Sequence, residues 1–195
     1  MIFFTSDTHF ASEDTLIREN RPFKNSNKFD KYVLVLWNKQ TKKEDTIYHL
    51  GDFLNYNSKD EKSWVKTLSY VKKLKANVIL IIGNNEQRVI DKHFKGNFEQ
   101  FREFCIGLGF KDVKIDDEIV INGNKFYLNH YPRNHKNEYI NLFGHTHRTT
   151  GLWKPYGLNV GCDLNHFFLY SQDEILRILE LKNKWWDNDV DNLEM

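Results

Sequence analysis

Short apolar runs recur along the chain, and each is followed at once by polar residues. Five of these runs have the composition and length of buried β-strands, and they cover residues 2–6, 46–50, 77–82, 127–129 and 140–143. Between the first three runs, apolar residues recur at spacings of three and four, which predicts helices over residues 29–40, 59–75 and 88–104. The first half therefore alternates strand and helix, an order typical of α/β proteins with a parallel sheet.

From Asp112 onward the predicted segments are shorter and are separated by turn residues. Asn122-Gly123-Asn124 predicts a hairpin turn between strands 118–121 and 125–128. We therefore expect the second half to be richer in antiparallel strands. One last amphipathic helix is predicted over residues 173–181.

Length and composition favour one domain. The 195 residues are 40% hydrophobic and 15% aromatic, which is enough to bury a substantial core. We expect a catalytic domain over residues 1–183 and a C-terminal tail over 184–195, where Trp185 and Trp186 are followed by acidic residues. The tail is open to three interpretations: it is loose, docked on the domain, or in contact with another chain.

Net charge and targeting signals narrow the range of possible binding partners. With 28 Lys and Arg against 27 Asp and Glu, the net charge of +1 gives no global field that would attract long nucleic acid or an acidic membrane. A local basic groove remains compatible with this balance. Cys105 and Cys162 are too few for a disulfide framework, and neither a signal peptide nor a long apolar run is present. We expect a cytoplasmic protein without a membrane partner.

Polar residues with metal-binding side chains stand directly after the predicted strands. They are Asp7, His9, Asp52, Asn84, His130, His145 and His147. In open α/β sheets, ligands collect at the carboxyl ends of the strands, so these side chains are expected to meet. Residues i and i+2 of extended backbone point to the same side, so each of the pairs 7/9 and 145/147 should face one cavity. A single carboxylate such as Asp52 has two oxygens and can bridge two cations.

This ordered set, Asp-x-His, Gly-Asp, Gly-Asn, His and Gly-His-x-His, resembles the calcineurin-like metallophosphoesterase superfamily over roughly residues 2–163. The stretches Arg21-Pro22-Phe23 and 158–163 are similar to a small bacterial and phage branch. The resemblance implies an α/β fold, a four-layer α/β/β/α sandwich with mixed sheets. It also implies that one metal is held by Asp7, His9, Asp52 and His147, and a second by Asp52, Asn84, His130 and His145.

Two divalent cations about 3.5–4 Å apart clamp the attacking and departing oxygens of a phosphate ester and acidify a bound water. We therefore expect hydrolysis of a small phosphate ester by a hydroxide that bridges the two metals. Imidazole and oxygen ligands without thiolate suit Mn²⁺, Fe²⁺, Zn²⁺, Co²⁺ or Ni²⁺. Mn²⁺ is the ion that we expect to support activity.

One residue departs from the pattern of the superfamily. Many members have, after Gly-Asn, a His that is thought to protonate the leaving group, and this chain has Asn85. General acid catalysis contributes about 10²–10⁴ in rate. Its absence favours substrates whose leaving group departs easily, and by analogy with similar small members we expect phosphodiesters.

Further candidates lie outside the ligand set. Arg133 and His135 follow the ligand His130 on one loop, where they are predicted to approach the substrate. Arg21 is a candidate by resemblance, and for both arginines the alternative is a salt bridge. Asp163 or backbone carbonyls are expected to orient the ligand imidazoles. The other histidines, His49, His93 and His166, are interpreted as structural or surface residues.

Asp52, Asn84 and His130, with Arg21, Arg133 and His135, are thus the predicted catalytic residues. The alternative functions are a monoester or protein phosphatase, a nuclease of the same superfamily, and a metal-stabilised binding module without catalysis. A nuclease would need a basic, aromatic-lined channel, for which the balanced charge gives no support. The natural substrate and the oligomeric state are left open by the sequence.

Overall fold

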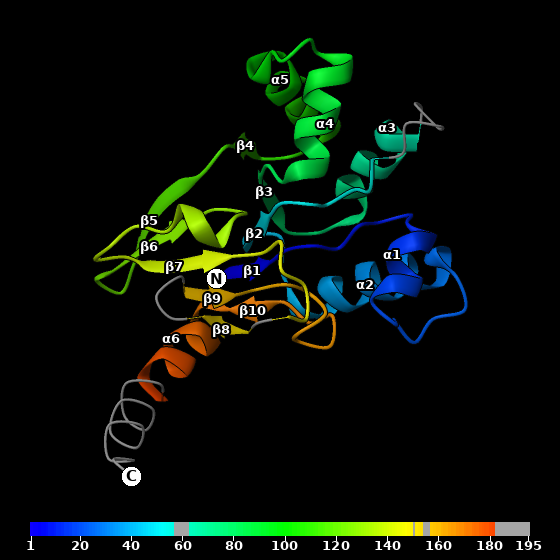
Figure 1. Cartoon of the computed structure of the whole chain (residues 1–195). Helices are drawn as coiled ribbons and strands as arrows, with labels where there is room; N and C mark the ends of the chain where they lie inside the picture. Colours follow the sequence, from blue (N-terminus) through cyan, green and yellow to red (C-terminus); the bar gives the residue numbers. More distant parts are fainter. Residues whose placement is uncertain (57–62, 150, 154–156, 182–195) are drawn as a thin grey trace.

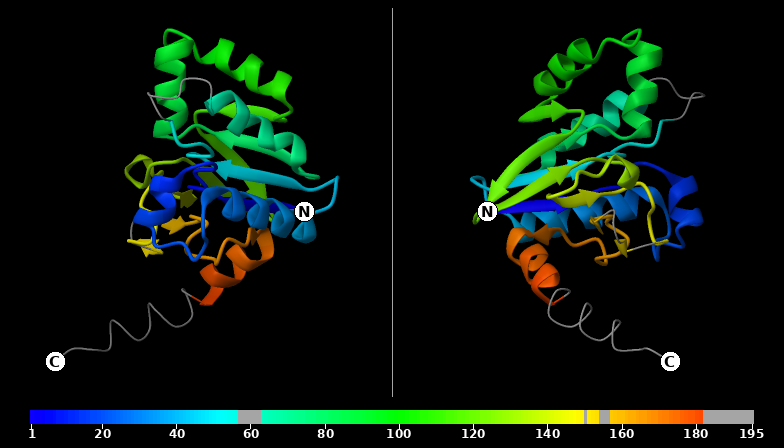
Figure 2. Two further views of the ribbon diagram at one scale, coloured as in Figure 1. Left: turned by 90° about the vertical axis from the view of Figure 1, so that its right-hand side faces the viewer. Right: turned by 60° about the vertical axis from the view of Figure 1, so that its left-hand side comes forward.

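The protein is described from a computed structural model, which describes residues 1–56, 63–149, 151–153 and 157–181. The tail over 184–195 and the first residues of the predicted helix 59–75 lie outside the described residues. Two five-stranded mixed sheets form the centre, and helices flank them (Figures 1 and 2). No helix in the described ranges is both long and apolar enough to cross a membrane.

The first sheet has the strand order β10-β1-β2-β3-β4. Its strands are β1 (Ile2–Thr5), β2 (Thr46–Leu50), β3 (Asn77–Ile81), β4 (Asp112–Lys114) and β10 (Tyr170–Ser171). Strands β1 to β4 are parallel, and β10 pairs antiparallel with β1. Thr5 pairs with His49, and Leu50 with Ile81, so the central strands end almost level at one edge.

The second sheet has the order β5-β6-β7-β9-β8. Its strands are β5 (Asp117–Ile121), β6 (Asn124–Leu128), β7 (Ile140–Phe143), β8 (Leu152–Trp153) and β9 (Gly157–Asn159). The predicted hairpin is confirmed: β5 and β6 are antiparallel, and Asn122 and Gly123 between them have φ of 50° and 80°. The pairs β6–β7 and β7–β9 are parallel, so this half is mixed.

Helices separate and follow these strands along the chain. They are α1 (Glu13–Arg18), α2 (Ser26–Gln40), α3 (Ser63–Leu68), the 3-10 helix η1 (Ser69–Lys73), α4 (Asn84–His93), α5 (Phe98–Leu108), the 3-10 helix η2 (Pro132–Asn134) and α6 (Gln172–Leu181). Figure 1 shows α3, α4 and α5 on one side of the strands and α6 on the opposite side, and both views of Figure 2 agree. The short helix α1 had no counterpart in the sequence pattern.

The prediction of one helix over 88–104 is wrong. Helix α4 ends at His93, and Lys95 and Gly96 then adopt positive φ of 53° and 80°. The side chain of Asn97 accepts a hydrogen bond from the backbone N–H of Gln100 and so begins α5. Apolar spacing continues across the break, which is why periodicity alone did not reveal it.

Alternating side chains of the first sheet serve two cores, as the period of two in a strand requires. On one face, Phe3 and Ile47 belong to a cluster that includes Trp37 of α2. On the other face, Phe4 belongs to a cluster with Phe126 of the second sheet, and the two rings stack with centroids 6.3 Å apart. The expected arrangement of two mixed sheets flanked by helices is therefore confirmed.

Candidate metal centre

All seven predicted ligands lie at one edge of the sandwich, just beyond the ends of strands. Asp7 and His9 follow β1, and Asp52 follows β2. The loops after these two strands run side by side, because the backbone N–H of Asp7 donates to the carbonyl of Gly51 and that of His9 to the carbonyl of Asp52. Asn84 is the first residue of α4, the helix that follows β3. The remaining ligands, His130, His145 and His147, follow strands β6 and β7 of the second sheet.

Asp7, His9 and His147 form one half of the centre. Nε2 of His147 lies 3.9 Å from Oδ1 of Asp7, and the rings of His9 and His147 stack with centroids 5.1 Å apart. Nε2 of His9 lies 3.5 Å from Oδ2 of Asp52. This half therefore offers imidazole and carboxylate ligands together.

His130, Asn84 and His145 lie on the other side of Asp52. Nε2 of His130 is 3.9 Å from Oδ1 of Asp52 and 3.3 Å from Oδ1 of Asn84. The same amide oxygen is 3.1 Å from Nδ1 of His145. Asp52 thus presents one carboxylate oxygen to each half of the centre.

The chemistry of this donor set fits divalent cations. Asp7 and Asp52 are buried carboxylates, and uncompensated buried charge is costly. Among the described residues, neither ring nitrogen of the buried His9 has a hydrogen-bond partner. Burial, with a further contribution from His147, lowers the pKa of His9 well below its ordinary value. A neutral imidazole with unpaired nitrogens beside two carboxylates is what a divalent cation requires.

Backbone geometry at the ligands differs from the extended pairs that the sequence analysis assumed. Asp7, His9, Asp52, His145 and His147 all have positive φ, between 47° and 71°. The 7/9 and 145/147 pairs do lie close together, but in residues of positive φ beyond the strands and not in alternating strand positions. Positive φ is uncommon for residues other than glycine, and such strain concentrates at functional sites.

The ligand imidazoles are oriented by neighbouring acceptors, as expected. Nδ1 of His130 lies 2.7 Å from the carbonyl of Leu50, and because a carbonyl only accepts, Nδ1 donates and Nε2 is left to face the centre. Nδ1 of His147 lies 3.4 Å from Oδ2 of Asp163. Burial lowers the pKa of His147, but Asp163, Asp7 and Glu19 more than offset this, so its pKa is raised.

Arg21 lies where it holds the centre together, and not where it would contact a substrate. Its side chain is buried, and Nε and Nη2 each donate to one carboxylate oxygen of Asp163 at 2.8 Å. Nη1 and Nη2 also donate to the carbonyls of Thr8 and Asp7. These donors of Arg21 are engaged by the chain itself, through a buried salt bridge, which is the alternative that the sequence analysis gave for this residue.

Two residues that sequence reasoning did not select as site residues hold Asp52 in place. Asn85 is buried; its backbone N–H donates to Oδ1 of Asp52 and its Nδ2 donates to Oδ2, at 2.9 and 2.8 Å. Glu86 accepts hydrogen bonds from four backbone N–H groups, those of Asp52, Phe53, Leu54 and Gly83. Burial raises the pKa of Glu86 to about 7. The Gly-Asn-x-Glu spacing at the start of a helix was the available signal.

The loop after His130 lies at the mouth of the centre. The ring of Tyr131 contacts the rings of His130 and His145 edge-on, with centroids 4.9 Å apart in both pairs. Arg133 is exposed, with its guanidinium carbon 5.9 Å from the Tyr131 ring, and His135 is half-buried on the same loop. Burial raises the pKa of the Tyr131 hydroxyl, while the charges of Arg133 and Arg88 act against this rise. Substrate contact by Arg133 and His135 stays a prediction.

The other histidines occupy structural or surface positions, as the sequence analysis interpreted them. His49 is buried in β2 and hydrogen-bonds to Thr8. His93, at the end of α4, packs its ring 5.0 Å from that of Trp64, and His166 is exposed in a loop.

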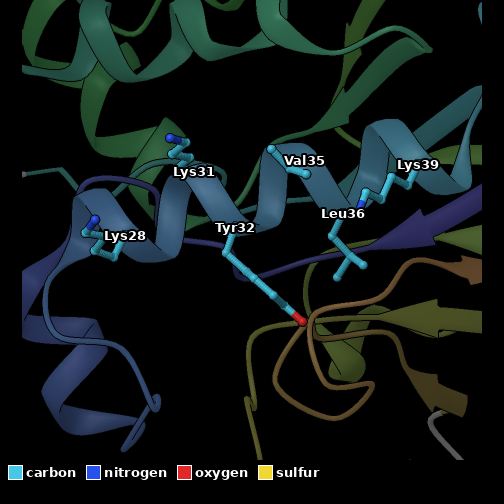
Figure 3. Close-up of a pocket in the computed structure, with 6 residues that line it drawn as sticks. All are labelled: Lys28, Lys31, Tyr32, Val35, Leu36 and Lys39. Carbon is cyan, nitrogen blue, oxygen red and sulfur yellow. The ribbon is translucent and has the colours of Figure 1, made fainter.

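A separate hollow of about 310 Å³ lies along α2 (Figure 3). The described residues that line it all come from this helix, namely Lys28, Lys31, Tyr32, Val35, Leu36 and Lys39. None of the predicted metal ligands is among them.

Comparison with known proteins identifies the family of this chain. A curated relative, the uncharacterized protein MJ1445 from Methanocaldococcus jannaschii, is 26% identical over 188 residues, which cover 92% of this chain and 91% of the relative. The crystal structure of AQ665 from Aquifex aeolicus, a protein of unknown function, superposes with a TM-score of 0.62 and 23% identity, covering 91% of this chain and 98% of that one. Residues 1–192 match the calcineurin-like phosphoesterase family. The chain therefore belongs to the calcineurin-like phosphoesterase family.

Proposed function

We propose that this protein is a phosphodiesterase that uses two divalent cations, with Mn²⁺ as the activating ion, to hydrolyse small phosphodiesters. Membership of its family supports a hydrolase that acts on phosphate esters and is typically metal-dependent. The observation that carries the proposal is the placement of Asp52. Its two oxygens face different sets of imidazole, carboxylate and amide ligands. A cytoplasmic location is part of the same proposal.

The ligand residues would hold the cations as follows: Asp7, His9, Asp52 and His147 would hold one, and Asp52, Asn84, His130 and His145 the other. Bound there, two cations would supply the positive charge that balances the phosphate and lowers the pKa of water. The protein contributes orientation. The Leu50 carbonyl fixes the ring of His130, Asp163 fixes that of His147, and Asn85 fixes the carboxylate of Asp52.

Preference for a diester rests on the absence of a proton donor at position 85. Asn85 is buried, its amide nitrogen is engaged by Asp52, and its oxygen accepts from the backbone N–H of Tyr56 at 3.0 Å. It therefore cannot protonate a departing oxygen. Without that help, substrates whose leaving group departs easily are favoured, and we expect diesters over monoesters of poorly leaving alcohols.

The test compares two chromogenic substrates that share a leaving group. The purified protein, stripped of metal and then supplied with Mn²⁺, should hydrolyse bis(para-nitrophenyl) phosphate faster than para-nitrophenyl phosphate, and EDTA should remove both activities. Release of nitrophenolate at 405 nm is the measurement. Faster hydrolysis of the monoester would support the phosphatase alternative. Absence of hydrolysis with every one of the five candidate metals, despite measured metal binding, would support the binding module.

A further inference from the structure

Beside the metal centre, the exposed face of α4 carries positive charge. Nη1 of Arg88 lies 3.4 Å from Oδ1 of Asn85, whose Nδ2 lies 2.8 Å from Asp52. The guanidinium is therefore separated from Asp52 by a single side chain. Lys92 follows one helical turn later, and residues at i and i+4 share one face of a helix.

Arg88 is available for a ligand. Arg18, Arg21, Arg102 and Arg148 each lie at ion-pair distance from a carboxylate. Within the described ranges, Arg88 is in no such pair, although it is exposed and close to a cluster of buried carboxylates. The acid nearest along the helix face, Asp91, accepts a hydrogen bond from Nε2 of Gln87 at 2.9 Å.

A hollow of about 390 Å³ opens at this place, and the described residues that line it are Tyr56, Arg88, Asp91 and Lys92. Its volume accommodates more than a single phosphate, since small-ligand pockets measure about 300–1,000 Å³. Two cationic side chains against one acid favour an anionic occupant. An arginine presents planar, paired donors, which suit phosphate oxygens.

We propose that Arg88, with Lys92, forms a second anion subsite, which binds a phosphate carried by the leaving group while the metal centre binds the phosphate that is hydrolysed. The proposal rests on the proposed function and deepens it. The substrate class is an ester or anhydride with a second phosphate next to the reacting one, as in a nucleoside diphosphate.

The proposed subsite would also compensate for the absence of a proton donor at position 85. In hydrolysis, the water oxygen forms a bond to phosphorus and a proton of the water passes to solvent. The bond from phosphorus to the leaving oxygen breaks, and its electron pair stays on that oxygen. A leaving group that ends in phosphate departs as a stable anion, so it needs no general acid. The positive charge of Arg88 stabilises the negative charge that the leaving group carries away.

The test uses AMP and ADP, which differ by one phosphate. On the Mn²⁺-loaded protein, calorimetric titration should show that ADP binds at least about tenfold more tightly than AMP, and Arg88→Gln should abolish most of this difference. Arg88→Lys should retain part of it. The matched control is Arg177→Gln, an exposed arginine on α6, which should leave the ratio unchanged.

Two outcomes would overturn the subsite. One is equal affinity of the wild-type protein for AMP and ADP, and the other is an unchanged ratio in Arg88→Gln. Circular dichroism and the Tm of each variant show whether it has folded. If Arg88→Gln has not folded, the ratio of ADP to AMP affinity is compared between the wild type and Arg88→Lys. Hydrolysis of bis(para-nitrophenyl) phosphate by the wild-type protein is measured in parallel. If that hydrolysis is present and the ADP preference is absent, the subsite fails and the proposed function stands.

Discussion

Replacement of Asp52 by asparagine is expected to lower turnover about a thousandfold and to leave the fold intact. Asp52 is the carboxylate that faces both halves of the centre, and an amide would offer only one oxygen and no charge. A catalytic metal ion supplies several kcal/mol of transition-state stabilisation, and a loss of about 4 kcal/mol corresponds to a factor of about 10³. Turnover of bis(para-nitrophenyl) phosphate with saturating Mn²⁺ is the measurement.

A stability measurement separates this effect from unfolding. Burial raises the pKa of Asp52, because it penalises the charged form of the carboxyl group. In Asp52→Asn the buried charge is removed, but the new amide nitrogen faces one of the two donors of Asn85. The metal-free variant should therefore have a Tm close to that of the metal-free wild type, whereas the rise in Tm on addition of Mn²⁺ should be lost. The control is Asp173→Asn, which alters an exposed carboxylate on α6. Near-normal turnover of metal-loaded Asp52→Asn would refute the bridging role.

Replacement of Arg21 by alanine is expected to destabilise the protein by about 3–5 kcal/mol, because it leaves the buried carboxylate of Asp163 without its cation. Both partners have side chains only 1% exposed, and the pair joins positions 142 residues apart in the chain. Urea unfolding at neutral pH measures the change. Arg148 provides a matched control, since it lies 3.8 Å from the same carboxylate with a side chain that is 47% exposed.

Arg148→Ala should cost less than about 1 kcal/mol, as exposed ion pairs do. If Arg21→Ala costs no more than that, the buried pair does not stabilise the fold. The pH dependence gives a second check. Burial alone would raise the pKa of Asp163, but hydrogen bonds from His147 and Arg21 bring it below its ordinary value of 3.8. A carboxyl with a depressed pKa stabilises the fold above its unfolded pKa, so the advantage of the wild type over Arg21→Ala should shrink below about pH 4.

The strands and the ligand positions were predictable because their signals are local. Residues 46–50 and 140–143 form strands with the predicted bounds, and Asn122-Gly123 makes the predicted turn. Ends of parallel strands meet at one edge whatever the details of the loops, so the convergence of Asp7, Asp52 and Asn84 followed from the order of elements. The family resemblance added the histidines of the second half of the chain.

What the sequence did not predict depends on contacts between distant segments or on unusual backbone. Positive φ at Asp7 and His145 could not be inferred, because neither residue type favours it as glycine does. The pairing of Arg21 with Asp163 leaves no periodic trace in the chain. The role of Asn85 also left no trace in the sequence pattern. The sequence analysis treated it as the absence of a general acid, whereas the structure shows that it positions Asp52.

The hydrogen bonds of Glu86 bear on which metal ion the site binds. By binding the backbone of the loop after β2 and the start of α4, it fixes the positions of Asp52 and Asn84 by contacts within the chain. We therefore expect these contacts to hold the predicted ligands in place without an ion, so that ions can be exchanged without refolding. Nitrogen and oxygen donors accept several transition metals, in a general order of affinity that places Mn²⁺ low. Occupancy in the cell should accordingly follow the supply of free ions, and preparations from zinc-rich and manganese-rich cultures should carry different metals on the same polypeptide.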